Sequence, residues 1–167
     1  CVRLPVICTF HQRLRFFSKP AGGVTTFYRL QKQSAQIHYG TDETNFTLGM
    51  AELSTRLSRR SLIIMLTDFV DTITAELMIE NMGRLAKRHL IVFVTFRSPD
   101  MEQLAGAQPR RMNDMVRSVV AGDFLRERQR VLKRLHRLGV HCIDTVPDKV
   151  SVEMLNRYLD IKRRELI

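Results

Sequence analysis

Residues 61–71 read Ser-Leu-Ile-Ile-Met-Leu-Thr-Asp-Phe-Val-Asp, a continuous apolar run that ends abruptly in Thr67 and Asp68. The run is too short to span a membrane, and it is typical of a strand that is buried on both faces, as in parallel sheets. In open α/β sheets, ligands bind beyond the carboxyl ends of the strands. Asp68 is therefore expected at the edge of the sheet where a cation or a partner would bind.

The sequence on either side of this run alternates between strand and helix patterns. Strands are predicted over residues 2–10, 14–17, 61–66, 90–96 and 140–146. Helices are predicted over residues 27–37, 46–57, 74–88, 99–104 and 152–165, with a longer amphipathic helix that starts near Met112 and is ended by Gly139. Helices of this length between strands predict parallel βαβ units. The expected fold is a doubly wound α/β sheet, mostly parallel, with helices on both faces and an antiparallel hairpin over residues 2–17 at one edge.

The helical spacing also predicts which apolar side chains face the core. The helix over 46–57 is expected to bury Phe46, Met50, Leu53 and Leu57. The three later helices are expected to bury Leu77, Ile79, Met82, Leu85 and Ala86, then Met112, Val116, Val120, Phe124, Val131, Leu135 and Leu138, and finally Leu155, Tyr158, Leu159 and Ile161.

Length and charge limit the possible functions. A chain of 167 residues and 19.4 kDa suits one domain spanning residues 1–167. The net charge is +10, and residues 110–137 hold nine basic and three acidic side chains. This asymmetry could attract nucleic acid, acidic lipid or an acidic protein face, but no groove-reading motif accompanies it. A solvated helix face is the favoured interpretation.

Cysteine and histidine usage gives little sign of a metal or disulfide framework. The cysteines Cys1, Cys8 and Cys142 form no close-spaced motif, which favours a reducing compartment with Cys8 and Cys142 as buried small apolar side chains. The histidines lack zinc-ligand spacing. The sequence also contains no nucleophile elbow and no phosphate-binding loop.

Three residues are candidate ligands for a hard cation such as Mg²⁺. Asp68 and Asp71 could hold it through carboxylate oxygens, although Asp71 is better placed to cap the following helix. Thr44 stands with Asn45 before the helix that starts at Phe46, and its hydroxyl could either reach the same cation or cap that helix. The sequence leaves these two roles of Thr44 open.

Several stretches carry a resemblance to a known family. The longest are residues 59–71 and residues 85–94, which read Leu-Ala-Lys-Arg-His-Leu-Ile-Val-Phe-Val. Residues 125–128, 138–140 and 156–159 fit as well, the last reading Asn-Arg-Tyr-Leu. Together they resemble the bacterial family called domain of unknown function 58, over essentially the whole chain.

The resemblance implies a divergent von Willebrand factor A domain. Such domains bind a divalent cation at the carboxyl edge of an α/β sheet and use it to engage protein partners. Their site combines an Asp-x-Ser-x-Ser loop after the first strand, a threonine and an aspartate. Thr44 matches the threonine and Asp68 the aspartate, so the implied cofactor is Mg²⁺.

The chain also departs from that pattern. It has no Asp-x-Ser-x-Ser loop, and Phe69 follows Asp68 where the wider family usually has glycine. Because the chain opens at Cys1 with a strand pattern, we expect it to begin after the first central strand of such a domain. The cation site would then be incomplete, and open strand edges would make the chain unstable or prone to aggregate when expressed alone.

The leading hypothesis is a non-enzymatic protein-interaction module, an adaptor in envelope-related assembly. The resemblance implies a MoxR-type AAA+ ATPase as partner and a cytoplasmic domain, anchored in the inner membrane only through an upstream segment. One alternative is a metal-dependent phosphohydrolase or nuclease that uses Asp68 and Asp71. Another is nucleic-acid binding through the basic face over residues 126–137.

Overall fold

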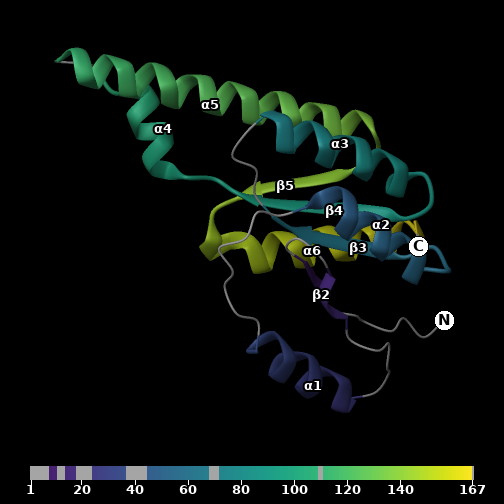
Figure 1. Ribbon diagram of the computed structural model, residues 1–167. Helices are drawn as coiled ribbons and strands as arrows, with labels where there is room; N and C mark the ends of the chain where they lie inside the picture. The colour runs from purple at the N-terminus through teal and green to yellow at the C-terminus, as the bar shows by residue number, and fades with distance from the viewer. Residues whose placement is uncertain are drawn as a thin grey trace. The chain divides into compact units, whose positions relative to one another are not determined.

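The computed structural model in Figure 1 describes residues 8–10, 14–17, 24–36, 45–67, 72–108 and 111–166. The chain divides into two units, Cys1–Ser58 and Arg59–Ile167, and each is described by itself.

The N-terminal unit contains a hairpin and two helices. Strand β1 (Cys8–Phe10) pairs antiparallel with β2 (Leu14–Phe17), which confirms the predicted hairpin over these residues. Among the described strands of this unit, the two form a two-stranded sheet.

The helices of this unit are α1 (Val24–Ser34) and α2 (Phe46–Arg56). Helix α1 begins and ends three residues earlier than predicted, and its Phe27 is exposed. Helix α2 is capped by Asn45, whose side-chain oxygen accepts a hydrogen bond from the backbone N–H of Leu48 at 2.9 Å. The predicted inner face of α2 is confirmed by the burial of Phe46, Met50 and Leu53.

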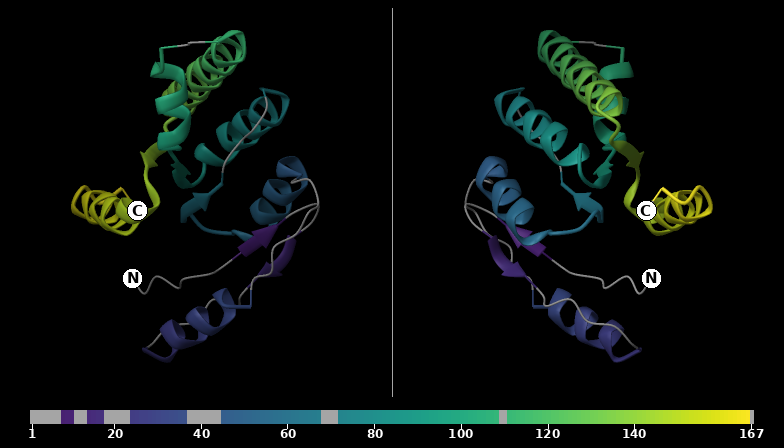
Figure 2. Two further views of the ribbon diagram at one scale, coloured as in Figure 1. Left: turned by 90° about the vertical axis from the view of Figure 1, so that its left-hand side faces the viewer. Right: turned by 90° about the vertical axis from the view of Figure 1, so that its right-hand side faces the viewer.

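The C-terminal unit is a parallel α/β sheet. Its elements are β3 (Leu62–Leu66), α3 (Thr72–Ala86), β4 (Leu90–Phe96), α4 (Pro99–Gly106), α5 (Met112–Arg137), β5 (His141–Thr145), the 3₁₀ turn η1 (Pro147–Lys149) and α6 (Val150–Arg163). The strand order is β3-β4-β5, and both pairs are parallel. Helices α3 and α5 lie on one face of this sheet and α6 lies on the other (Figure 2). The predicted α/β class, with parallel strands and helices on both faces, is confirmed for this unit.

Strand β4 forms the centre of the sheet. Register pairs Ile64 with Val92 and Val92 with His141. Side chains alternate between the faces, so Ile91 and Phe93 face α3 and α5 while Val92 and Val94 face α6. All four are buried.

Strand β3 differs from the prediction. Ile63 and Met65 are buried, but Ile64 is 39% exposed and Leu66 57% exposed. The prediction that this run is buried on both faces is therefore wrong for β3, although it is right for β4. The reason is position: β3 lies at an edge of the described sheet, and the buried cluster around Ile161 of α6 packs over β4 and β5.

The helices bury less apolar surface than predicted. On α5, Val131 and Leu135 are buried as predicted, and Ala121 is buried in addition. The predicted burial is wrong for four exposed side chains of this helix and its end: Met112, Val116, Val120 and Leu138. Leu155 and Leu159 on α6 and Leu77 on α3 are also exposed, which corrects the corresponding predictions. The described sheet has three strands and is narrow, so each covering helix buries only the side chains that face the sheet directly.

The exposed part of α5 has a further cause. Its N-terminal half extends past the sheet and packs against α4, as Figure 1 shows. The Ser118 hydroxyl donates to the carbonyl oxygen of Ala105 at 3.2 Å, which places α4 on that side of α5.

Candidate functional site

The carboxyl ends of the three parallel strands lie at one edge of the sheet. Thr67 follows β3, Thr95 and Phe96 end β4, and Asp144 and Thr145 end β5. Two backbone hydrogen bonds continue the ladder past the strands: the Thr67 N–H donates to the carbonyl oxygen of Val94 at 3.2 Å, and the Arg97 N–H donates to that of Thr145 at 2.8 Å. This edge is therefore well ordered by its own backbone.

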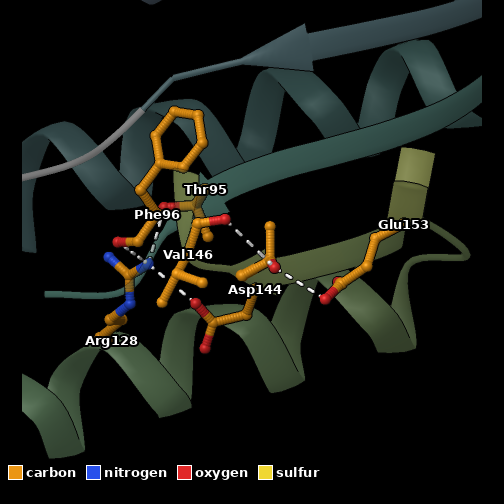
Figure 3. A network of polar contacts seen from close by, with 7 residues as sticks. Thr95, Phe96, Arg128, Asp144, Val146 and Glu153 are labelled. Carbon is orange, nitrogen blue, oxygen red and sulfur yellow. Dashed lines mark hydrogen bonds and ion pairs between the residues drawn. The ribbon is translucent and has the colours of Figure 1, made fainter. Parts of the chain in front are cut away.

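A buried arginine joins helix α5 to this edge. Arg128 is 5% exposed, and its Nη2 lies 2.9 Å from Thr95 Oγ1, 2.6 Å from the Phe96 carbonyl oxygen and 3.0 Å from Asp144 Oδ1 (Figure 3). Burying a charge is costly unless it is paired and hydrogen-bonded, and Asp144 supplies the opposite charge. One guanidinium thus holds α5 to the ends of both β4 and β5.

A second polar contact joins helix α6 to the same edge. The buried hydroxyl of Thr145 donates to Glu153 Oε1 at 2.7 Å (Figure 3). Because neighbouring residues of a strand face opposite sides, Asp144 points toward α5 while Thr145 points toward α6. The edge is therefore clamped from both faces of the sheet.

This arrangement fixes the carboxylates in place. Asp144 is paired with Arg128, and Glu153 accepts the hydrogen bond of Thr145. Within the described residues, no group of three or more histidine, cysteine, aspartate or glutamate side chains is placed to hold a metal ion.

The sequence interpretation missed the role of Arg128 because it grouped this residue with the basic face of the long helix. A signal was nevertheless present. Ala121, Arg128, Val131 and Leu135 are spaced by seven, three and four residues, and all four are buried. Arg128 thus falls on the core side of α5, unlike the exposed Arg126 and Arg130.

The predicted ligands of the cation, Thr44 and Asp68, lie outside the described residues, as does Asp71. Of their neighbours, Thr67 continues the ladder at the end of β3, and Asn45 caps α2. The helix cap that Thr44 was considered for is therefore supplied by Asn45.

The pKa values of His89, His141, Cys8 and Cys142 are shifted toward the neutral forms of these side chains. His89 is 4% exposed, and neither ring nitrogen has a hydrogen-bond partner among the described residues. Burial lowers the pKa of His89, and the nearby Arg88 charge lowers it further. Burial also lowers the pKa of His141, with Arg157 adding to the effect.

The thiols of Cys8 and Cys142 are free and half-buried, close to the predicted role of small apolar side chains. Burial raises the pKa of each to about 11, so both are protonated at neutral pH. A thiol in that state is a poor nucleophile.

None of the described helices combines the length and apolar character needed to cross a membrane. Comparison of the chain with protein families, with curated proteins and with solved structures found no match.

Proposed function

We propose that this chain is a non-enzymatic protein-interaction module of von Willebrand factor A type, which binds its partner at the carboxyl edge of its parallel sheet. The observation that carries the proposal is the parallel order β3-β4-β5, in which β3 ends two residues before Asp68 in the sequence. Ligand sites of α/β sheets lie beyond such strand ends. The family resemblance suggests a MoxR-type AAA+ ATPase as the partner.

The resemblance assigns a Mg²⁺ ion to Asp68 and Thr44. Carboxylate and hydroxyl oxygens are suitable ligands for this hard cation. The side chain of Asn45 caps α2, so the Thr44 hydroxyl is not needed for this cap. The cation would supply a positive charge to which an acidic side chain of the partner could bind.

The polar network at the edge favours binding over catalysis. A hydrolase of the alternative kind would need further carboxylates, free to act as acid and base, beside Asp68 and Asp71. Of the acidic side chains in the described network, Asp144 is engaged by Arg128 and Glu153 by Thr145. They position α5 and α6, and this role suits a rigid docking surface.

Calorimetric titration with Mg²⁺ tests the cation site. We expect Asp68→Ala to abolish binding and Thr44→Ala to weaken it. Asp148→Ala is the matched control, because Asp148 is an exposed aspartate in η1, and it should leave the titration unchanged. Full binding by Asp68→Ala would show that the site is assigned to the wrong residue.

Copurification with the purified MoxR-type ATPase tests the partner. We expect retention in Mg²⁺, loss in EDTA, and loss for Asp68→Ala. A parallel assay with bis(p-nitrophenyl) phosphate and Mn²⁺ addresses the phosphohydrolase alternative. Turnover that disappears in both Asp68→Ala and Asp71→Ala would contradict the proposal and support that alternative.

A further inference from the structure

Helix α5 carries one exposed stripe along its whole length. Its members recur alternately four and three residues apart: Met112, Val116, Val119, Asp123, Arg126, Arg130, Lys133 and Arg137. This spacing keeps side chains on one side of an α-helix, and it is the spacing that a second helix uses to pack. All eight residues are exposed. We call them the α5 stripe.

The N-terminal half of the α5 stripe is apolar. Met112 is 77% exposed, Val116 56% and Val119 55%, while Met115 at 52% and Val120 at 59% widen the patch. Helix α4 does not cover it, since none of these five side chains is buried although α4 packs against α5. Contiguous exposed apolar side chains of this kind mark interaction sites.

The C-terminal half of the α5 stripe is basic. Asp123 pairs with Arg126, and Glu127 beside the stripe pairs with Arg130. Lys133 and Arg137 form no ion pair within the described part of the chain, so this half keeps an excess of positive charge. A partner that covers it must bring acidic side chains.

We propose that the α5 stripe is the docking site of an amphipathic helix from a partner protein, apolar over one half and acidic over the other. The spacing of the stripe fits helix packing, and the change from apolar to basic midway along it specifies the order of side chains on the partner. At 26 residues, α5 is about 39 Å long, enough for a helix of several turns. The site is separate from the sheet edge and requires no cation.

The order of the two halves favours a protein helix over a membrane. A helix bound to a bilayer lies in the interface with one side at a single depth. Here the apolar and basic side chains occupy the same side of α5 and follow one another along its axis. A flat orientation would place Arg130 and Arg137 as deep in the bilayer as Val116.

The same order disfavours nucleic acid and a second copy of the chain. Nucleic acid would use the basic half and leave Met112, Val116 and Val119 exposed. Two parallel copies of α5 would face basic half to basic half. Two fully overlapping antiparallel copies would place the apolar half of each against the basic half of the other. An acidic and apolar partner satisfies both halves.

Binding of synthetic helical peptides tests the proposal. Each of two 26-residue peptides has a stripe of residues spaced alternately four and three apart, with leucine at the stripe positions of one half and glutamate at those of the other half. In one peptide the leucine half is N-terminal, and in the other it is C-terminal. One peptide therefore matches a parallel orientation on α5 and the other an antiparallel one. We expect one of them to bind in fluorescence anisotropy. A third peptide with lysine in place of glutamate should bind at least tenfold more weakly.

Substitutions on the stripe locate the site. Val116→Glu and Lys133→Glu should each weaken binding at least tenfold, and Lys133→Glu combined with Arg137→Glu should bind the lysine peptide better than the parent does. Val152→Glu and Arg163→Glu are the matched controls on α6, where both side chains are exposed, and they should have no effect. Thermal melting confirms that each variant is folded.

Four results would overturn the proposal. The first is that neither glutamate peptide binds, and the second is that binding survives Val116→Glu. The third is that phosphatidylglycerol vesicles or a DNA duplex bind in place of the peptides, and that this binding is lost with Val116→Glu and Lys133→Glu. The fourth is that the parent self-associates in sedimentation and that Val116→Glu makes it monomeric. Asp68→Ala should leave the affinity for the peptides unchanged, because the α5 stripe does not include the proposed cation site. Peptide binding therefore tests the α5 stripe independently of the proposed function at the sheet edge.

Discussion

Arg128 shows how a single residue can tie a helix to the end of a sheet. Its guanidinium bonds to Thr95, Phe96 and Asp144 from a nearly fully buried position. The Asp144 side chain keeps about a third of its surface in water, so this ion pair is mostly but not completely removed from solvent. The pair therefore gains from a lower local dielectric constant without burying both charges completely.

We predict that Arg128→Met lowers the free energy of unfolding by about 2–3 kcal/mol, because it removes the buried donor that bonds to Thr95 Oγ1, the Phe96 carbonyl oxygen and the Asp144 carboxylate. Urea denaturation measures the loss. Arg130→Met is the control, since Arg130 is exposed and pairs only at the surface, and it should change stability by less than about 1 kcal/mol. Equal losses for both variants would contradict the assigned role.

His89 is buried and has no hydrogen-bond partner in the described part of the chain, and this predicts a pH dependence of stability. Burial holds its folded-state pKa below the unfolded value of 6.5. As pH falls below 6.5 the unfolded chain takes up a proton that the folded chain does not, so stability falls until the folded-state pKa is passed. His89→Leu should flatten this decline and, by removing an unsatisfied polar group, stabilise the chain by about 1–3 kcal/mol.

Urea midpoints between pH 7.5 and pH 5 measure this effect. His141 also has a pKa lowered by burial and by Arg157, so His141→Asn removes a second contribution of the same sign. The double variant should show the smallest decline. A decline in His89→Leu as steep as in the parent would mean that the imidazole is not responsible.

Residue-level prediction from sequence succeeded where spacing alone decided burial, as at Phe46, Met50 and Leu53. It failed at Arg128, whose type suggests a surface although its helical position is on the core side. A charged residue in a buried position needs partners from other elements. Thr95 and Asp144 lie 33 and 16 residues away, and nothing local in the sequence indicates that they meet Arg128.

At the scale of elements, two apolar runs that look alike in sequence have different surroundings. The strands β3 and β4 are both continuous apolar runs, yet only β4 is flanked by a strand on each side in the described sheet. Strand composition predicts that a strand forms but not its place in the sheet. Met112, Val116 and Val120 are exposed for two reasons. Met112 and Val116 lie on the side of α5 that continues as the exposed Arg130 and Arg137, and the sheet ends before the helix does.

The end of α5 allows a matched test of backbone conformation. Gly139 has φ +82°, a left-handed value that other residues adopt only with strain, and a Cβ there would meet no atom within 4 Å. Gly139→Ala should therefore cost about 1–2 kcal/mol from the backbone alone. At Gly106, which ends α4, a Cβ also meets open space, so Gly106→Ala should stabilise by up to about 1 kcal/mol.

Urea denaturation of the two glycine variants gives the comparison, because neither adds a steric contact. Opposite signs are expected. A shift of the same sign and size in both would show that the conformation at Gly139 carries no strain for alanine.

On the scale of the whole molecule, the chain divides between Ser58 and Arg59. The boundary lies between α2 and β3, and Ser58, Arg59 and Arg60 are exposed and belong to no helix or strand. Proteases cleave most readily at exposed backbone outside regular structure. The two adjacent arginines make this boundary a natural site for trypsin.

We therefore predict that brief trypsin treatment releases a fragment that starts at Arg60 or Ser61 and contains β3 to α6. The arginines and lysines of α5 lie in a helix that must unfold locally before it can be cut, so they should be cleaved more slowly than Arg59 and Arg60. Mass spectrometry of timed samples identifies the fragment. Arg59→Gln combined with Arg60→Gln removes both cleavage points and should delay its release. If trypsin digests the parent and this variant at the same rate and no such fragment accumulates, the chain does not divide at Ser58 and Arg59 into two units that differ in resistance to trypsin.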